Sequence, residues 1–172
     1  RHRIEHAQVV APDDFARFAA LGVIASMQPV HESSDMRWAE QRLGPERSRG
    51  AYAWRTFLNH KVRLAFGTDF AVEPLNPTRG LYACVTLELP EGGPPGGWQP
   101  QEKISIDECI AAYTTGSAYA EFMEGKKGQI IPGQFADLVV LSADVTKIPP
   151  PQILKTEVLR TILAGRSIYF KP

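Results

Sequence analysis

The sequence predicts an α/β protein with parallel strands, followed by a short antiparallel β segment. Three short segments, residues 1–6, 23–28 and 62–66, are predicted strands, and the stretches between them have helical periodicity. Short links from strand to helix to strand are typical of a parallel sheet, because parallel strands need a crossover connection. Near the end of the chain, residues 157–163 and 167–170 flank a glycine-containing turn and indicate a hairpin.

The first crossover carries clear helix signals. Pro12 and the two acids after it suit a first helical turn, because Pro lacks the amide that would be unpaired there and acids favour the positive end of the helix dipole. Apolar residues follow at helical spacing, and Gly22 is a natural C′ residue. In the second crossover, residues 30–47 are polar and irregular with a short helix expected around 36–43, and residues 48–59 form a plausible amphipathic helix.

Beyond the third strand, residues 78–86 are expected to be helical and residues 90–100, rich in Gly and Pro, to be a surface loop. Ser105-Ile-Asp-Glu108 is a capping box that opens the next helix, which we expect to break at Gly116 and to end by Gly125. The chain then changes character to a turn and β-strands. We therefore expect two units, residues 1–127 and residues 128–172.

Composition excludes several classes of protein. The 172 residues are 44% hydrophobic and 22% charged with a formal net charge of zero, which argues against nucleic acid or an anionic membrane as partner. No apolar run approaches the roughly 20 residues of a membrane span. Cys84 and Cys109 are too few for a disulfide framework, so we expect two small core residues and a cytoplasmic location. The chain does not begin with Met, and Arg1 to His6 has the character of a strand in mid-fold, so we expect a piece of a longer protein.

Polar side chains follow each predicted parallel strand. His6 ends the first strand, Gln28 and His31 follow the second, and Asp69 follows the third after Gly67-Thr68. An acid two residues after a strand-ending glycine can project into a cleft, although such a residue can also simply cap a turn or helix. Because the carboxyl ends of parallel strands meet at one edge, these side chains can converge. Imidazole and carboxylate groups suit zinc, which indicates metal-assisted hydrolysis.

From the residues alone, two strand–helix steps feeding a third strand fit either a TIM barrel or an open doubly wound sheet. No glycine-rich phosphate loop follows any of the three strands, which argues against a nucleotide-binding unit.

The motifs Arg-Ile-Glu-His6-Ala, Ser-Met-Gln28-Pro-Val-His31 and Phe-Gly-Thr-Asp69, with Glu-Pro-Leu-Asn-Pro77 after them, resemble the amidohydrolase superfamily. The branch they resemble most is the YtcJ-like metal-dependent hydrolases, or amidohydrolase 3 group. The segment from Gly128 to Leu141 also resembles that group, at the point where its chain leaves the barrel for a small β-sandwich domain.

The resemblance implies the C-terminal part of a TIM (β/α)8 barrel, about strands 6 to 8, followed by part of that β-domain. It implies that His6 is a metal ligand, that Asp69 is a metal ligand and the catalytic acid/base, and that His31 and Gln28 bind substrate. The implied cofactor is a divalent metal, expected to be zinc, in one or two ions. The implied reaction is hydrolysis of a non-peptide carbon–nitrogen bond in a small amide- or formamide-like substrate.

The chain has no counterpart of the group's first-strand His-x-His pair, its fourth-strand bridging residue or its fifth-strand His. His2 lies near the start of its strand and is expected to be structural rather than a substitute ligand. We therefore expect an incomplete metal site, inactive alone, that needs the N-terminal portion of the same barrel as its partner. Two alternatives stay open, a catalytically silent barrel piece and a metal-free α/β module that binds a small molecule, and a homo-oligomer is compatible with each.

Overall fold

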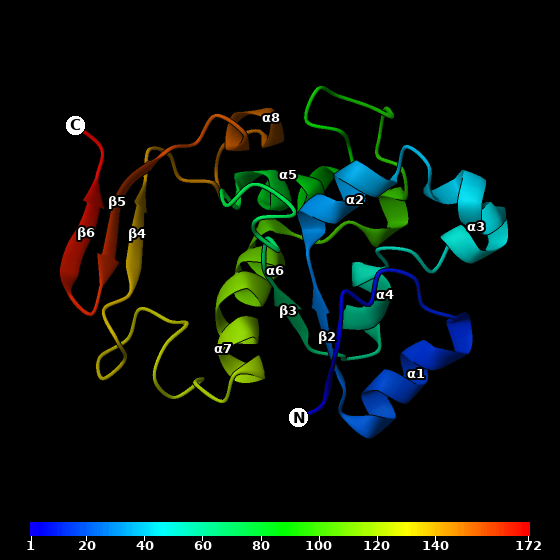
Figure 1. The fold of residues 1–172 in the computed structure, drawn as a ribbon, viewed down its shortest axis with the longest axis horizontal. Coiled ribbons are helices and arrows are strands. Elements are labelled where there is room, and N and C mark those ends of the chain that lie inside the picture. Colours follow the sequence, from blue (N-terminus) through cyan, green and yellow to red (C-terminus); the bar gives the residue numbers. More distant parts are fainter.

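The computed structural model describes all residues, 1–172, and confirms the α/β class (Figure 1). A three-stranded sheet is built from β1 (Arg3–Glu5), β2 (Ile24–Met27) and β3 (Leu64–Phe66), in that order and all parallel. Glu5 pairs with Ser26, and Met27 pairs with Phe66. The predicted parallel pairing is therefore confirmed, and the carboxyl ends of the three strands share one edge.

One face of this sheet is covered by α1 (Pro12–Leu21) and α4 (Trp54–Asn59). Aromatic rings pack between the two helices. Phe57 of α4 contacts Phe15 and Phe18 of α1 edge-on, at centroid distances of 4.8 and 5.1 Å. The predicted helix end at Gly22 is confirmed by its left-handed φ of 63°. Burial of such rings contributes much of the driving force that fixes the crossovers on the sheet.

The second crossover differs from the expectation. Residues expected to be irregular form α2 (Pro29–Asp35), and a kinked α3 (Ala39–Ser48) follows it. The helix expected over 48–59 is reduced to α4, because Ala51 pairs with Val9 in an isolated bridge and the next residue has a left-handed backbone. Contacts with the loop after β1 thus override the helical periodicity of this segment.

The helix expected after β3 is confirmed, since α5 spans Thr78–Thr86 and packs against α2. A long loop follows and leads to the short 3₁₀ turn η1 (Pro100–Glu102). The capping box is present at the start of α6 (Ile106–Ala111), where the Ser105 hydroxyl accepts from the Glu108 amide and the Glu108 carboxylate accepts from the Ser105 amide.

The expected break at Gly116 is wrong. A π-turn, η2 (Ala112–Gly116), joins α6 to α7 (Ser117–Ala120) without interruption. Glycine is required at 116 by a close approach, because a Cβ there would lie 2.1 Å from the Leu64 carbonyl oxygen. The Ser117 hydroxyl donates to the Phe66 carbonyl at 2.8 Å, so this helix is pinned against β3. β3 is fully buried, whereas every residue of β1 is exposed.

Cys84 in α5 and Cys109 in α6 are both fully buried, as expected of core residues. The structure joins them in a disulfide, which was not expected. Two cysteines separated by 25 positions give no sign in the sequence that their helices are neighbours.

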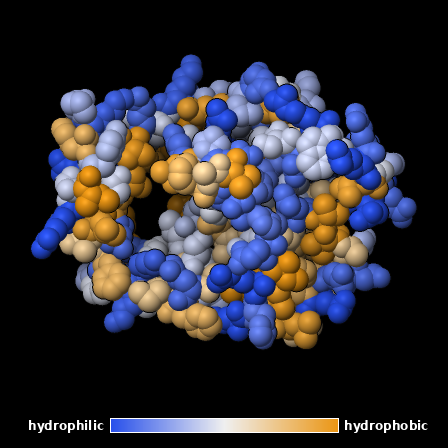
Figure 2. Space-filling view, in the orientation of Figure 1, coloured by the Kyte–Doolittle hydropathy of each residue, from blue (hydrophilic) through white to orange (hydrophobic).

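The last part of the chain forms a separate antiparallel sheet of β4 (Leu138–Leu141), β5 (Val158–Leu163) and β6 (Arg166–Phe170), which includes the predicted hairpin. Figure 2 shows a hollow between this sheet and the main body. Between β4 and β5, α8 (Pro150–Ile153) packs against the main body, and Ile153 is part of the main core.

The boundary between two units at residues 127 and 128 stays a prediction. No helix of the structure has the length and apolar content needed to cross a bilayer.

Candidate metal centre

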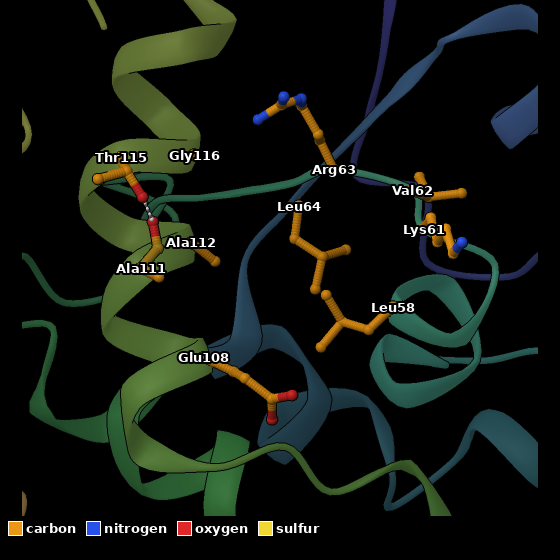
Figure 3. Close-up of a pocket in the computed structure, with 10 residues that line it drawn as sticks. All are labelled: Leu58, Lys61, Val62, Arg63, Leu64, Glu108, Ala111, Ala112, Thr115 and Gly116. Atoms are coloured by element: carbon orange, nitrogen blue, oxygen red, sulfur yellow. Dashed lines mark hydrogen bonds between the residues drawn. The ribbon is translucent and has the colours of Figure 1, made fainter.

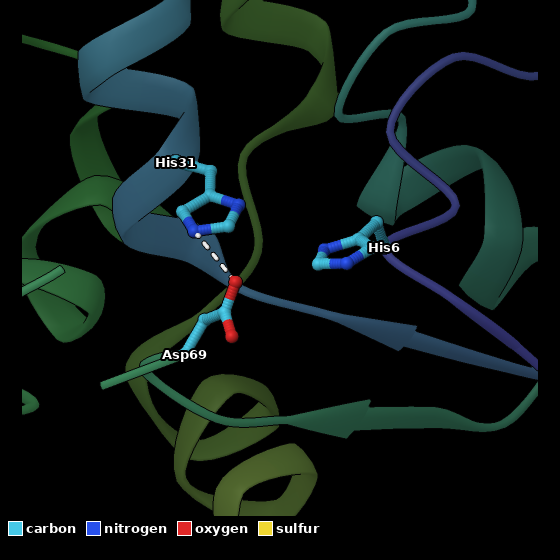
Figure 4. A group of neighbouring side chains, drawn as sticks. All are labelled: His6, His31 and Asp69. Atoms are coloured by element: carbon cyan, nitrogen blue, oxygen red, sulfur yellow. Dashed lines mark ion pairs between the residues drawn. The ribbon is translucent and has the colours of Figure 1, made fainter. Parts of the chain in front are cut away.

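Three side chains from three consecutive strand ends converge in the structure (Figure 4). His6 follows β1, His31 lies in the first turns of α2 after β2, and Asp69 follows β3. One potential ligand atom from each residue lies within 4.8 Å of those of the other two. The prediction that His6 and Asp69 lie at the same end of the sheet is confirmed.

The backbone at two of these positions is unusual. His6 and Asp69 have φ angles of 70° and 56°, and Ala7 beside His6 has 41°. Residues with a Cβ adopt this left-handed region rarely and at a cost in free energy. Such conformations concentrate at functional sites, where surrounding contacts hold them in place.

His6 is oriented by Gln28, the residue that precedes α2. The His6 Nδ1 lies 2.9 Å from the Gln28 Oε1, so Nδ1–H donates to the amide oxygen. This leaves the lone pair of Nε2 free, which is the arrangement that metal-bound histidines show in proteins. Gln28 was predicted to bind substrate. The structure brings it to the site, but its contact there is with the imidazole of His6.

His31 is buried, with 7% of its surface exposed. Its Nε2 points toward Asp69 and lies 3.6 Å from Oδ2, which is too long for a hydrogen bond, and this nitrogen has no hydrogen-bond partner. Its ring is stacked beside that of His6, with centroids 5.8 Å apart. The sequence indicated a place near the substrate, and the structure brings His31 into the same cluster as His6 and Asp69.

Sequence reasoning missed a polar network behind His31. The Gln8 Nε2 lies 3.3 Å from the His31 Nδ1, 3.2 Å from the Asp35 Oδ2 and 2.8 Å from the Tyr52 hydroxyl. The Tyr52 hydroxyl also donates to Asp35. The only signal in the sequence is that Gln8 lies two residues after His6, because nothing in the spacing connects it with positions 35 and 52.

The loop after Asp69 begins with a tight turn, in which the Asp69 carbonyl accepts from the Val72 amide at 2.7 Å. The loop continues past Pro74 and Pro77 into α5 and leaves apolar side chains exposed, among them Phe70 and Leu75. No atom lies within 4 Å of the place where a Cβ of Gly67 would be, so nothing in this chain requires glycine there.

Glu32, next to His31 in α2, is fully buried, and its Oε1 has no hydrogen-bond partner. Burial raises the pKa of Glu32 to about 8, so the carboxyl group is mostly uncharged at neutral pH.

Other candidate positions lie away from this cluster. His2 is exposed near the beginning of β1, as expected, and His60 ends α4 with its ring stacked on Phe15. A cavity of about 340 Å³ lies between the beginning of β3 and the α6–η2 helix, lined by residues such as Arg63 and Thr115 (Figure 3). It is at the opposite end of β3 from Asp69, so it is separate from the metal centre. A smaller cavity of about 250 Å³ reaches Gln28 and Gly67 along the sheet.

Several known proteins are similar to this chain. The family whose model matches this chain is the amidohydrolase family, and the match covers residues 1–169. The putative amidohydrolase YtcJ of Bacillus subtilis (strain 168) is 33% identical over 99% of this chain and 32% of its own length. The N-substituted formamide deformylase of Arthrobacter pascens is 26% identical over 95% of this chain and 30% of its own length.

Among solved structures, an uncharacterized metal-dependent hydrolase from Pyrococcus horikoshii OT3 superposes with a TM-score of 0.76 at 28% identity, over 86% of this chain and 30% of that one. The chain thus spans about a third of the length of the proteins it matches, 32% and 30% in the two relatives. The match of the family to nearly all of the sequence, together with the fold, shows that this chain belongs to the amidohydrolase family.

Proposed function

We propose that this chain carries part of the active site of a metal-dependent hydrolase that cleaves non-peptide carbon–nitrogen bonds in small amide- or formamide-like substrates. The observation that supports this most is the convergence of His6 and Asp69 at the carboxyl edge of a parallel sheet, in a chain of the amidohydrolase family. The formamide deformylase among its relatives supports the substrate class.

The residues fit a divalent metal such as zinc. His6 offers an imidazole nitrogen whose orientation is set by Gln28, and Asp69 offers a carboxylate that is one-third exposed. Nitrogen and carboxylate oxygen are the usual ligands of a catalytic zinc. When bound, a divalent ion supplies Lewis-acid chemistry that makes water acidic enough to react near neutral pH.

In this proposal Asp69 moves the protons. A carboxylate at the carboxyl edge of the sheet accepts a proton from the attacking water and returns it to the leaving nitrogen, so that amide and water give a carboxylic acid and an amine. The exposed apolar side chains after Asp69, Phe70 and Leu75 among them, are available to contact an apolar part of the substrate.

A catalytic zinc site normally has three protein ligands, and His6 and Asp69 supply two. We propose that the N-terminal portion of the same barrel supplies the rest, and that β1, β2 and β3 are strands 6 to 8 of a TIM barrel. The exposed β1 is a strand with no neighbour on its outer edge, which fits this arrangement. The small sheet has exposed apolar residues on β6, including Ile168 and Phe170, and fits part of a larger β-domain.

The open edge of β1 also favours the second candidate, a barrel piece that is catalytically silent until its partner portion is present. A metal-free module that binds a small molecule is the third candidate.

The experiment compares the full-length protein with its Asp69→Asn and Asp13→Asn variants in hydrolysis of N-formylated amines, before and after metal chelation. Asp13 lies exposed in the first turn of α1 and serves as the matched control. We expect chelation to abolish turnover, Asp69→Asn to reduce kcat by roughly 100- to 10,000-fold, and the control to leave it unchanged. Turnover that survives both chelation and Asp69→Asn would contradict the proposal.

A further inference from the structure

The two nitrogens of the His31 imidazole face different polar groups, an amide and a carboxylate. On one side Nδ1 is 3.3 Å from the Gln8 Nε2. On the other, the buried and unpartnered Nε2 is directed at the Asp69 Oδ2, 3.6 Å away. A neutral imidazole carries one proton, so the chemistry on the Gln8 side decides what His31 presents to Asp69.

The surroundings of Gln8 fix which end of its amide faces His31. The same nitrogen lies 3.2 Å from the Asp35 Oδ2, and a carboxylate only accepts hydrogen bonds. The Tyr52 hydroxyl uses its single proton on Asp35, so its oxygen accepts from Gln8 at 2.8 Å. Burial raises the pKa of Tyr52, as does the nearby Asp35, which keeps this hydroxyl protonated. A flipped amide would direct oxygen at two acceptors, so the NH₂ group is the end that faces this network.

The two hydrogens of the Gln8 NH₂ group are shared among three neighbours, the His31 Nδ1, the Asp35 Oδ2 and the Tyr52 hydroxyl oxygen. An amide nitrogen cannot accept a hydrogen bond, so a proton on Nδ1 of His31 would face it without an acceptor. Nδ1 is therefore the acceptor, and the ring proton is on Nε2. We propose that the Gln8–Asp35–Tyr52 network holds His31 as its Nε2–H tautomer, so that His31 presents an N–H to Asp69 and positions it, and is not a third metal ligand. An Nε2 that carries a proton has no lone pair for an ion. This inference rests on the proposed function for the role of Asp69, and it replaces substrate binding as the role of His31.

Several elements hold the network in place. The Tyr52 amide donates to the Gln8 carbonyl at 2.9 Å, and Val9 and Ala51 form a β-bridge, so the loop after β1 is joined to the segment before α4. His31 and Asp35 are one turn apart in α2 and face the same side. The tautomer therefore depends on packing between segments of this chain.

The two histidines then have opposite roles. The Gln28 oxygen accepts from Nδ1–H of His6 and leaves its Nε2 free to bind an ion, whereas the Gln8 nitrogen donates to Nδ1 of His31 and leaves Nε2–H. An N–H directed at the Asp69 Oδ2 attracts that oxygen across 3.6 Å and leaves Oδ1 for the metal and the reaction.

The first test measures the tautomer directly, by long-range ¹H–¹⁵N NMR of the ¹⁵N-histidine-labelled full-length protein, metal-free and zinc-loaded. We expect His31, assigned by its loss in His31→Gln, to show a protonated Nε2 and an unprotonated Nδ1 in both forms. Gln8→Met should mix the tautomers, whereas Gln41→Met, an exposed glutamine in α3, should not. An Nδ1–H tautomer of wild-type His31 would overturn the inference whether or not metal is bound.

The second test compares zinc content and affinity in His31→Gln, His6→Gln and His2→Gln variants of the same protein, with exposed His2 as control. His31→Gln retains an amide donor and should keep stoichiometric zinc, whereas His6→Gln should lose affinity by roughly 10- to 100-fold or more. His31→Leu should also keep zinc but lower kcat by roughly 10- to 100-fold, with partial recovery in His31→Gln. Equal loss of zinc in His31→Gln and His6→Gln would overturn the inference. A wild-type protein that binds no zinc would instead contradict the proposed function.

Discussion

At the scale of single residues, the metal centre depends on short contacts that orient each side chain. Gln28 is the clearest case, because its amide oxygen is the only group that accepts from His6 Nδ1–H. Replacement of Gln28 by Leu should leave the fold intact and weaken zinc binding by roughly 10- to 100-fold, the usual effect of losing such a partner.

Metal titration of the full-length protein measures this effect, with Gln41→Leu on the exposed face of α3 as control. If Gln28→Leu raised KM and left zinc affinity unchanged, the predicted substrate-binding role would be correct and the orienting role wrong.

The sequence predicted His6 and Asp69 at one edge of the sheet because their positions depend only on strand ends in a parallel sheet. It also placed His31 at that edge, but it could not predict α2, because this short helix buries a histidine, a glutamate and a serine among its first five residues. Periodicity identifies apolar faces, so a helix with a buried polar face is classed as a loop. Gln8 was missed for a related reason, since its partners come from three separate segments.

At the scale of elements, Gly116 allows the helix from α6 to α7 to approach β3 closely, and Ser117 donates a hydrogen bond to β3 beside it. A Cβ at Gly116 would lie 2.1 Å from the Leu64 carbonyl, and this backbone atom cannot move without disturbing β3. Gly116→Ala should lower the free energy of unfolding by about 1–3 kcal/mol, as overpacking does in other cores.

Gly125→Ala is the matched control, because nothing lies within 4 Å of its Cβ position. Urea denaturation of both variants measures the difference. Equal stability of the two would mean that the helix does not approach β3 as closely as the structure has it. The sequence marked Gly116 as a helix breaker because a close approach to another element cannot be seen from local spacing.

The beginning of α6 gives a prediction about pH. The Arg55 guanidinium donates two hydrogen bonds to the Glu108 carboxylate, at 2.8 and 2.6 Å, and lowers the pKa of Glu108 to about 2, with help from the Ser105 amide. Because the folded pKa is below the unfolded value of roughly 4.3, this stabilisation is complete above that pH and is lost as pH falls toward 2.

Glu108→Gln should therefore cost about 1 kcal/mol at pH 7, a value reduced by the partial exposure of the pair, and the difference from wild type should shrink below pH 4.5. Asp107→Asn, in the same turn but without an ion pair, is the control. Denaturation curves at several pH values measure the trend, and a difference that stays constant down to pH 3 would contradict it.

At the scale of the whole molecule, the exposed β1 and the thinly covered sheet β4–β6 predict how residues 1–172 behave alone. Unpaired strand edges and exposed apolar side chains such as Ile168, Tyr169 and Phe170 favour association. Purified alone, the chain should aggregate, bind zinc weakly and hydrolyse no amide, whereas the full-length protein should do the opposite.

Size-exclusion chromatography with metal analysis tests this. A soluble monomer of residues 1–172 that retains stoichiometric zinc and cleaves an amide would show that the site is complete without an N-terminal portion.

The change from parallel to antiparallel strands follows from the lengths of the connections, so it could be predicted from the sequence. The disulfide between Cys84 and Cys109 could not, because it depends on the packing of α5 on α6.

The most direct test of the central proposal, that His6 and Asp69 hold a catalytic metal, is anomalous diffraction at the zinc edge from crystals of the full-length protein grown with zinc. We expect a peak about 2.0–2.2 Å from an imidazole nitrogen of His6 and from a carboxylate oxygen of Asp69, with His31 outside bonding distance. A zinc-loaded crystal with no peak between His6 and Asp69 would contradict the proposal.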